Sequence, residues 1–343
     1  MDAERIGALA ARISDEIGKV VVGQERAVHD LVVSLLAGGH VLLEGAPGTA
    51  KTLMVRALSQ CVTASFRRVQ FTPDLMPTDI VGVNMWNQET HAFAFHAGPV
   101  FADLLLADEI NRAPAKTQAA LLEAMSERRV TVDGTAYPLP RLFTVVATQN
   151  PVEYEGTYPL PEAELDRFMM KVVVPYPARD QEQRILERYA EGFDAEREDT
   201  FGVSAATDVG GVMAARAALS SVIAEPKVLG YVTDVIRATR ETGSLTLGAS
   251  PRAGVALFRC ARAAAAVAGR NYVTPDDVKA MAPAVLRHRV TVSPEVEIEG
   301  GSADDVIAAL LGRVEGPTSS PSPSPPRRQR PSPWRSSATA VHA

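Results

Sequence analysis

The chain has 343 residues, of which 46% are hydrophobic and 22% are charged. This length is sufficient for a domain of common size and a second, smaller one. The 41 aspartates and glutamates outnumber the 35 lysines and arginines, so the net charge of −6 provides no chain-wide basic field for holding nucleic acid. An acidic enzyme or a partner-binding protein fits this balance better.

The charge is distributed unevenly along the chain. Residues 316–343 carry four arginines and no acidic residue, so the body before them carries −10, which is the total of −6 less the +4 of this tail. Of the 28 tail residues, 14 are proline or serine, and such a composition cannot bury enough surface to offset its ordering entropy. The sequence therefore predicts a disordered tail after an acidic body.

Cysteine usage and hydropathy indicate the compartment. Cys61 and Cys260 form no CxxC pair or metal-ligand cluster, which argues against a disulfide scaffold and against a structural zinc site. The most apolar stretch, residues 31–43, is interrupted by serine, glycine and histidine and is too short to span a bilayer. We expect a cytoplasmic protein that does not insert into a membrane.

Apolar periodicity predicts alternating helices and strands over the first half of the chain. Residues Ile6, Leu9, Ile13 and Ile17 recur at helical spacing. Further helices are expected over 25–37, 51–60 and 117–127, and short buried strands over 40–44, 68–71, 104–108, 144–148 and 172–174. This alternation predicts an α/β fold with a mostly parallel sheet flanked by helices.

Beyond residue 177 the pattern becomes helical. The helical segments expected there are 179–192, 207–223, 227–241, 252–268, 275–286 and 303–313. We therefore predict three parts: an α/β core over 1–177, an all-helical domain over 178–315 and the tail over 316–343.

Two hairpins interrupt the alternation in the core. One has alternating strand residues on both sides of Asp133-Gly134, which is a preferred two-residue turn for a twisted ribbon. The other is looser and joins residues 80–86 to 91–96. Both are interpreted as insertions on the core.

A glycine-containing loop between a predicted strand and a predicted helix is the strongest chemical signal. It matches the phosphate-binding loop GxxxxGK[ST], in which backbone N–H groups surround an anion, the lysine reaches the β and γ phosphates and the hydroxyl ligates magnesium. Alanine replaces the second glycine, which is tolerable if its φ stays negative. The loop consists of Gly45, Ala46, Pro47, Gly48, Thr49, Ala50, Lys51 and Thr52.

Polar residues end two of the later strands. Asp108 and Glu109 follow an apolar strand, where one carboxylate can hold the magnesium water shell and the next can deprotonate an attacking water. Asn150 ends another strand and could hydrogen-bond the γ phosphate or that water. An asparagine before a proline is also common turn chemistry, and both readings stay open for Asn150. Together with the loop, these residues predict an ATP hydrolysis site.

Long motifs in the sequence resemble the MoxR family of AAA+ ATPases. The resemblance is carried by Val22-Gly23-Gln24, the loop GAPGTAKT, LLLADEINRAP, ATQNPVEYEGTYPLPEAELDRF and Ser250-Pro251-Arg252-Ala253. It spans roughly residues 4 to 313, and alanine in the loop is itself typical of that family. The fold it implies is a P-loop NTPase core followed by a helical lid and the tail.

The resemblance implies roles for further residues. Val22, Gly23 and Gln24 would line the adenine pocket, and Leu53 would join the nucleotide-binding residues. Asn150 matches the first sensor, Arg167 the arginine that AAA+ rings project into the neighbouring subunit's site, and Arg252 the second sensor. The alternatives are an ion pair of Arg167 with Asp166 or Glu164, and a surface arginine at a helix start for Arg252.

The resemblance also names the two hairpins and the function. Residues 79–97 resemble the helix 2 insert, and residues 128–141 the hairpin before the first sensor. The family implies a homo-oligomeric ring, expected to be a hexamer, that uses ATP and Mg²⁺ to remodel or mature a protein client or to insert its metal cofactor. A von Willebrand factor A domain partner is also implied. A nucleic-acid motor and a chelatase-type subunit are the alternatives, and the acidic body disfavours the first.

Overall fold

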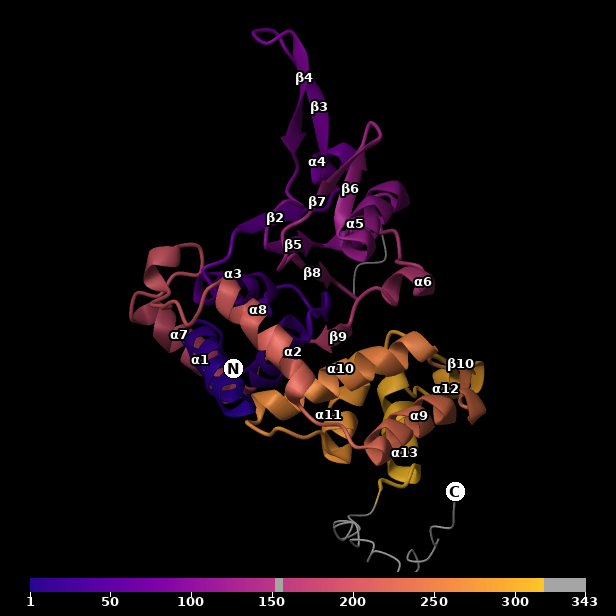
Figure 1. The fold of residues 1–343 in the computed structure, drawn as a ribbon. Coiled ribbons are helices and arrows are strands. Elements are labelled where there is room, and N and C mark those ends of the chain that lie inside the picture. The colour runs from indigo at the N-terminus through magenta and orange to yellow at the C-terminus, as the bar shows by residue number, and fades with distance from the viewer. Residues whose placement is uncertain (152–156, 318–343) are drawn as a thin grey trace, which may run out of the picture.

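The core of the molecule is a five-stranded parallel sheet, seen in a computed structural model that describes residues 1–151 and 157–317 (Figure 1). The strand order is β2-β5-β8-β1-β9, and every pair of neighbours is parallel. The strands are β1 (Val41–Glu44), β2 (Phe66–Gln70), β5 (Leu104–Asp108), β8 (Thr144–Gln149) and β9 (Met170–Val173). They confirm the predicted α/β fold.

Both faces of the sheet are covered, so nearly all residues of its central strands are buried. Alternate residues of β5 enter different hydrophobic clusters: Leu104 and Leu106 pack on one face, Leu105 and Ala107 on the other. The first cluster includes helices α1 (Ala3–Gly18), α2 (Glu25–Ala37) and α3 (Lys51–Cys61). The second includes α4 (Pro77–Val81) and α5 (Ala115–Glu127).

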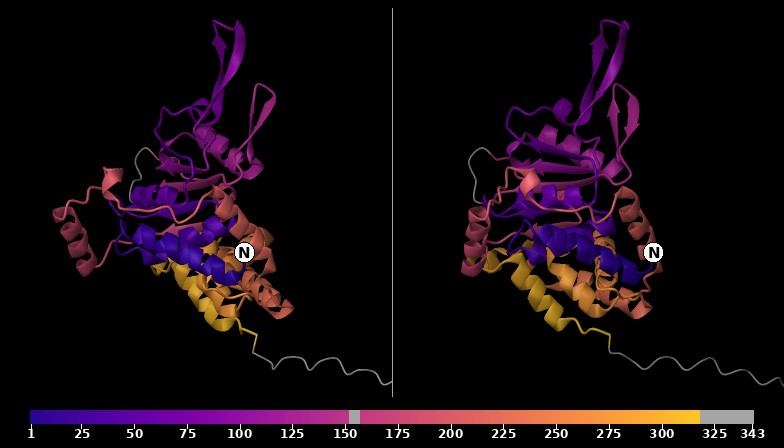
Figure 2. Two further views of the ribbon diagram at one scale, coloured as in Figure 1. Left: turned by 60° about the vertical axis from the view of Figure 1, so that its left-hand side comes forward. Right: turned by 90° about the vertical axis from the view of Figure 1, so that its left-hand side faces the viewer.

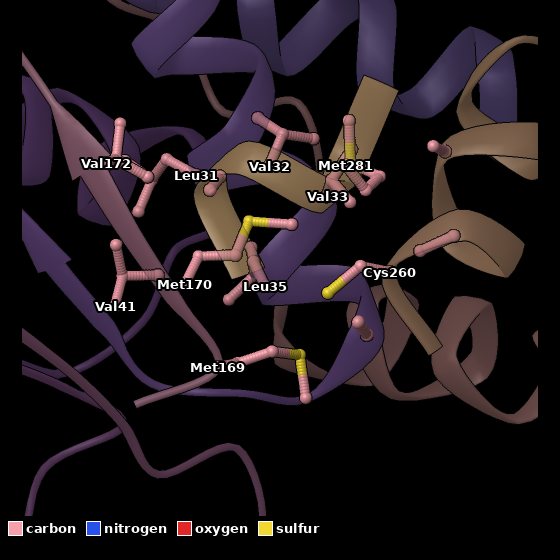
Figure 3. Packing of buried hydrophobic residues seen from close by; sticks show 14 of the residues in the cluster. Leu31, Val32, Val33, Leu35, Val41, Met169, Met170, Val172, Cys260 and Met281 are labelled. Atoms are coloured by element: carbon pink, nitrogen blue, oxygen red, sulfur yellow. The ribbon is translucent and has the colours of Figure 1, made fainter. Parts of the chain in front are cut away.

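The helical lid packs against the core through one continuous hydrophobic cluster. Helix α10 (Pro251–Val267) contacts both α1 and α2. Figure 3 shows side chains of α2 between the sheet and the lid helices, where the labelled residues include Leu31, Leu35, Val41, Met170, Val172, Cys260 and Met281. Both cysteines are free and buried, and burial raises the pKa of each thiol to about 12.

The lid follows the predicted helices closely. Its helices are α8 (Val209–Ala218), α9 (Pro226–Glu241), α10, α11 (Pro275–Leu286), α12 (Pro294–Ile298) and α13 (Ala303–Arg313), with short 3₁₀ turns η2 (Glu198–Thr200) and η3 (Leu219–Ser221). The short helix α12 was not predicted, and neither was a small antiparallel pair formed by β10 (Leu245–Leu247) and β11 (Thr291–Val292). Strands this short carry no alternation that a sequence can reveal.

Two hairpins project from the core on the side away from the lid (Figures 1 and 2). The longer one consists of β3 (Gly82–Asn87) and β4 (Ala92–Ala97), and the shorter of β6 (Arg129–Val132) and β7 (Thr135–Pro138). They brace each other, because Asn84 donates to Asp133 over 2.7 Å and the rings of Phe95 and Tyr137 stack at 4.0 Å. Both hairpins were predicted.

Three elements remain, of which the first two lie within the core and the third leads from β9 toward the lid. They are η1 (Ile110–Arg112), α6 (Glu162–Leu165) and α7 (Arg179–Ala190). Among the described residues, no helix combines the length and the apolar character that crossing a bilayer requires. The predicted disorder of the tail concerns residues that, from 318 on, lie outside the described part of the chain.

Candidate functional site

The phosphate-binding loop connects β1 to α3 at the carboxyl edge of the sheet. Gly45 permits its path, since a Cβ there would lie 2.4 Å from the carbonyl oxygen of Val174. The Lys51 ammonium donates to the carbonyl oxygens of Gly45 and Ala46, over 2.6 and 2.7 Å. Burial lowers the pKa of Lys51, and the nearby Asp108 and Glu109 oppose this shift. The lysine is thus held over the loop, near where a phosphate would bind.

Ala50 adopts a left-handed backbone conformation, with φ of 65°. The sequence reading accepted alanine here on condition that φ stays negative, and that condition is not met. Gly48 also has positive φ, 79°, and loops that visit this region form concavities lined by N–H groups that bind anions. A non-glycine residue in this conformation costs about 1–2 kcal/mol. The loop therefore keeps a shape suited to phosphate despite strain at Ala50.

Asp108 lies at the end of β5 and is surrounded by three donors. The Thr148 hydroxyl donates to its Oδ1 over 2.6 Å, and the Thr52 hydroxyl lies 3.3 Å from its Oδ2. Arg68 of β2 donates to the same Oδ2 from Nε at 3.0 Å and from Nη2 at 2.7 Å. The structure thus brings together Thr52 and Asp108, the two predicted magnesium ligands, and adds an arginine that was not predicted.

Glu109 is held by three neighbours in a strained position. Its φ is 56°, and its N–H donates to the Thr148 hydroxyl over 2.9 Å. Gln70 donates to its carboxylate over 2.7 Å, and Arg112 Nε lies 3.0 Å from the same oxygen. Positive φ in a residue other than glycine is characteristic of functional sites. The carboxylate is oriented by fixed hydrogen bonds.

A cavity of about 540 Å³ joins these residues, a volume within the range of small-molecule sites. Of the predicted residues, Val22 and Gln24 line it together with Asp108, Glu109, Asn150 and the loop from Pro47 to Leu53. Gly23 lines another cavity that shares Gln24 with this one, and the Gln181 side chain fills the space that a Cβ on Gly23 would occupy. Gln24 is buried and donates to the carbonyl of Pro175 over 2.8 Å.

The cavity also has apolar lining residues that were not predicted. Ile185 and Tyr189 of α7 and the following Phe193 line it opposite Val20 and Val22. The rings of Tyr189 and Phe193 meet edge to face at 5.3 Å. Helix α7, which the sequence reading placed with the lid, therefore contributes apolar residues to the wall of the cavity that contains the loop.

Comparisons with known proteins agree with this geometry. The model of the ATPase family associated with various cellular activities (AAA) matches residues 40–170, and the AAA lid domain matches residues 237–310. The chain is 42% identical to Chaperone MoxR1 of Mycobacterium tuberculosis, over 88% of this chain and 81% of that protein. It is 33% identical to Protein MoxR of Methylorubrum extorquens, over 90% of this chain and 95% of that one. The chain belongs to the MoxR family of AAA+ ATPases.

Two further comparisons extend over nearly the whole chain. The Bacillus subtilis protein YeaC is 42% identical over 92% of this chain and 97% of its own length. A solved structure of a candidate ATPase from Cytophaga hutchinsonii superposes with a TM-score of 0.83 at 40% identity, covering 91% of this chain and 96% of that chain. As a MoxR-family AAA+ protein, the chain binds nucleotide and hydrolyses ATP. AAA+ ATPases generally work as oligomeric rings.

The two arginines that the MoxR resemblance singles out lie outside the nucleotide cavity of their own chain. Arg167 donates from Nη1 to the carbonyl of Leu122 over 2.8 Å and to the Ser126 hydroxyl over 2.6 Å, both on α5. Arg252 begins α10, with its side chain 59% exposed and Nε 3.8 Å from Asp166. Asp166 also accepts from Arg289 over 2.6 Å, so its partners come from the lid.

Proposed function

We propose that this chain is a subunit of a homo-oligomeric ring, a hexamer in the simplest case, in which ATP hydrolysis remodels a protein client. One observation carries the proposal: Arg167 and Arg252 lie outside the cavity that holds the loop, Asp108 and Glu109 of their own chain. Arg252 lies 3.8 Å from Asp166, the residue before Arg167 in the chain. Both guanidinium groups would therefore act on the nucleotide of the adjacent subunit.

A neighbouring arginine suits this chemistry. The guanidinium group stays charged and offers several donors to phosphate oxygens, and an arginine finger is worth roughly 10³ to 10⁵ in turnover in other phosphoryl-transfer systems. The Nη1 atom of Arg167 donates hydrogen bonds to α5, and these bonds fix the orientation of the guanidinium group. In this proposal Arg167 stabilises the transition-state charge, and Arg252 links the lid to the same phosphates.

The residues of the loop would hold the nucleotide and its metal. Oxygen ligands are what Mg²⁺ prefers, and the Thr52 hydroxyl and the Asp108 carboxylate meet within 3.3 Å beside the loop. Mg²⁺ bound there would neutralise charge on the phosphates. Lys51 would move from the carbonyls of the loop to the β and γ phosphates. Glu109 would accept the proton of the attacking water, and Asn150, which lines the cavity, would help to position that water.

The longer hairpin supports a protein client rather than nucleic acid. Its side chains are largely apolar and open to solvent: Phe93 is 71% exposed, and Met85 and Trp86 are each 52% exposed. Trp86 and Phe93 meet edge to face at 5.3 Å. Contiguous exposed apolar surface of this kind marks interaction sites, and apolar segments of an unfolded chain would match it. Remodelling, maturation and metal-cofactor insertion all fit such a client.

A partner with a von Willebrand factor A domain is part of the proposal. Its support is the membership in the MoxR family and the resemblance of the motifs quoted above. In this arrangement the partner delivers the client, and ATP hydrolysis by the ring drives the remodelling. Basal ATPase activity should then rise on addition of the partner and should not respond to single-stranded DNA.

Mixing two inactive variants tests the shared site. Arg167→Ala keeps an intact loop but offers no finger, whereas Lys51→Ala keeps the finger but cannot hold the phosphates. If the finger acts between subunits, a mixture of the two variants regains ATPase activity. In mixed rings, the intact loop of an Arg167→Ala subunit lies beside the intact Arg167 of a Lys51→Ala subunit. The same pairing tests Arg252→Ala. The matched control is Arg237→Ala, an exposed lid arginine paired with Glu241, which should retain full activity alone.

The outcome distinguishes the two arrangements. Recovered activity at intermediate mixing ratios supports sites completed by the neighbour. Mixtures no more active than either variant, when sedimentation shows that mixed rings form, would mean that each arginine serves its own subunit. Normal turnover of Arg167→Ala alone would remove it from the site.

A further inference from the structure

A second cavity, of about 390 Å³, lies on the side of the core opposite the nucleotide. It forms around the end of α2, near the first residues of β1 and β8, whereas the phosphate-binding loop follows the last residue of β1. Its walls come from the core and from the lid helices α8 and α10. Five arginines line it, namely Arg128, Arg141, Arg216, Arg259 and Arg262.

The charge of this arginine cavity is not neutralised within the described part of the chain. Although the body of the protein is acidic, no carboxylate among residues 1–151 and 157–317 lies within 4.0 Å of any of the five guanidinium groups. Burial and the neighbouring Arg128 and Arg259 lower the pKa of Arg216 to about 10. Burial and Arg259 also lower the pKa of Arg128. The five positive charges repel one another.

Helix capping accounts for three of the arginines. Arg216 donates to the carbonyl of Leu35 over 2.8 Å, Arg259 donates to the carbonyl of Ala37, and Arg128 lies 3.4 Å from that of Gly38. These carbonyls end α2, where positive charge is favourable. Capping therefore explains part of the cluster without a ligand.

Capping does not account for the other two. The side chains of Arg141 and Arg262 donate no hydrogen bond to any described residue, and the Arg262 Nε is buried without a partner. The Arg262 guanidinium lies over the ring of Phe258, with its Cζ 4.4 Å from the ring centroid. Buried donors are ordinarily satisfied, and the Arg262 Nε lacks a partner that an acceptor bound in the cavity could supply.

We propose that the arginine cavity binds a small polyphosphate, either inorganic or the phosphate chain of a nucleotide. Guanidinium groups match phosphoryl oxygens through paired hydrogen bonds, and several of them converge here on a volume suited to a small ligand. The apolar part of the wall, including Leu36, Met213 and Leu219, has no aromatic side chain for stacking bases. The chain's own tail is basic and would be repelled.

Such a ligand would tie the lid to the core. Arg128 and Arg141 flank the shorter hairpin of the core, whereas Arg216 and Arg262 belong to lid helices. One anion contacting both pairs would bridge the core and the lid. The proposal concerns a site separate from the nucleotide cavity and does not depend on the function proposed above.

Titration calorimetry with sodium tripolyphosphate tests the site in the full chain carrying Lys51→Ala, which weakens phosphate binding at the loop. One equivalent should bind in magnesium-free buffer. Adding Arg141→Gln and Arg262→Gln should weaken that binding by about tenfold or more, because each removes a charge-assisted hydrogen bond to the phosphate, and neither arginine side chain donates a hydrogen bond to a described residue. The charge-matched control adds Arg237→Gln and Arg313→Gln, two lid arginines outside the cavity, and should bind like the parent.

Comparing ligands and variants in this titration identifies the ligand and can overturn the proposal. ATP that binds more tightly than tripolyphosphate identifies a nucleotide, and equal affinity identifies the phosphate chain alone; both support the site. Loss of binding in both double variants would show a general charge effect. Unchanged binding in both, or tighter binding of an acidic peptide such as hexaglutamate, would also reject it.

A charge reversal separates binding from folding. Arg141→Glu should abolish tripolyphosphate binding and at the same time raise the melting temperature of the ligand-free protein, because it relieves the mutual repulsion. A merely structural role of Arg141 predicts a lower melting temperature, and that result would contradict the proposal.

Discussion

Arg68 donates two hydrogen bonds to a single carboxylate oxygen of Asp108, the same oxygen that faces the Thr52 hydroxyl. A guanidinium group thus lies where the proposed magnesium would meet its protein ligands. Arg68 neutralises Asp108 in this structure, and in the proposed site it would give up part of this contact to the metal. The edge position of β2 allows this, since the Arg68 side chain is half exposed.

Replacing Arg68 should change the magnesium requirement. In Arg68→Gln, the Mg²⁺ concentration that gives half-maximal ATPase activity at saturating ATP should fall by up to about fivefold, because a half-exposed ion pair is worth roughly 0.2–1 kcal/mol. The neighbouring Arg67→Gln is the control, since Arg67 is exposed on the same strand and has no carboxylate within 4.0 Å among the described residues. A raised requirement in Arg68→Gln would show that this arginine instead helps to bind the nucleotide.

Replacing Glu109 should separate binding from hydrolysis. Glu109→Gln keeps the shape that Gln70 and Arg112 surround but cannot accept a proton, so turnover should fall by roughly 10² to 10⁴ while ATP affinity changes little. Filter binding with labelled ATP and single-turnover hydrolysis measure the two quantities. The control is Glu123→Gln, an exposed acid on α5. Turnover close to that of the unmodified chain would place the base elsewhere.

The sequence identified the parts of the site that lie in one continuous motif. The loop, Asp108 and Glu109 are each read locally from a strand and the residues after it. Arg68 and Gln70 could not be predicted, because their roles depend on β2 pairing with β5 in the register that sets Gln70 opposite Asp108. Tyr189 was missed for a similar reason: α7 has no buried residue, and only the tertiary structure brings it to the nucleotide cavity.

Ala50 shows a second kind of limit, since motif matching does not give a dihedral angle. Its φ of 65° is costly for alanine and not for glycine. Ala50→Gly should therefore raise the unfolding free energy by about 1 kcal/mol, after allowance for the greater freedom of glycine in the unfolded chain. Urea denaturation without nucleotide measures this. The control is Ala64→Gly. Ala64 does not have a positive φ, so this substitution relieves no strain and should lower the unfolding free energy or leave it unchanged.

The exposed aromatic pair of the longer hairpin, Trp86 and Phe93, should be required for binding the client but not for ATP hydrolysis. Trp86→Ser with Phe93→Ser should leave basal ATPase activity and melting temperature unchanged, because both side chains are solvent-exposed. Binding of a permanently unfolded model protein, reduced and carboxymethylated lactalbumin, should be lost. Ile298→Ser, which removes an 87% exposed apolar residue from the lid, should bind normally. Equal binding by the hairpin variant would exclude this surface as the client contact.

His40 should make the protein sensitive to acid. It is fully enclosed between the sheet and α5: its Nδ1 accepts from the Val145 N–H over 2.9 Å, and its Nε2 lies 3.3 Å from the Met125 carbonyl. Both contacts fit a neutral ring protonated on Nε2. Burial, and then the charge of Arg128, lower the pKa of His40 from 6.5 to about 3.

This shift fixes the direction of the pH effect. Below pH 6.5 the unfolded chain binds a proton at His40 that the folded chain does not accept until about pH 3, so the unfolding free energy falls as the pH falls through this interval. One such group contributes a slope of up to about 1.4 kcal/mol per pH unit. Between pH 6 and pH 4.5, urea unfolding of His40→Gln should show a slope smaller by about that amount. His96→Gln, at an exposed hairpin position, should keep the parent slope, and an unchanged slope in His40→Gln would mean that the folded protein accepts the proton.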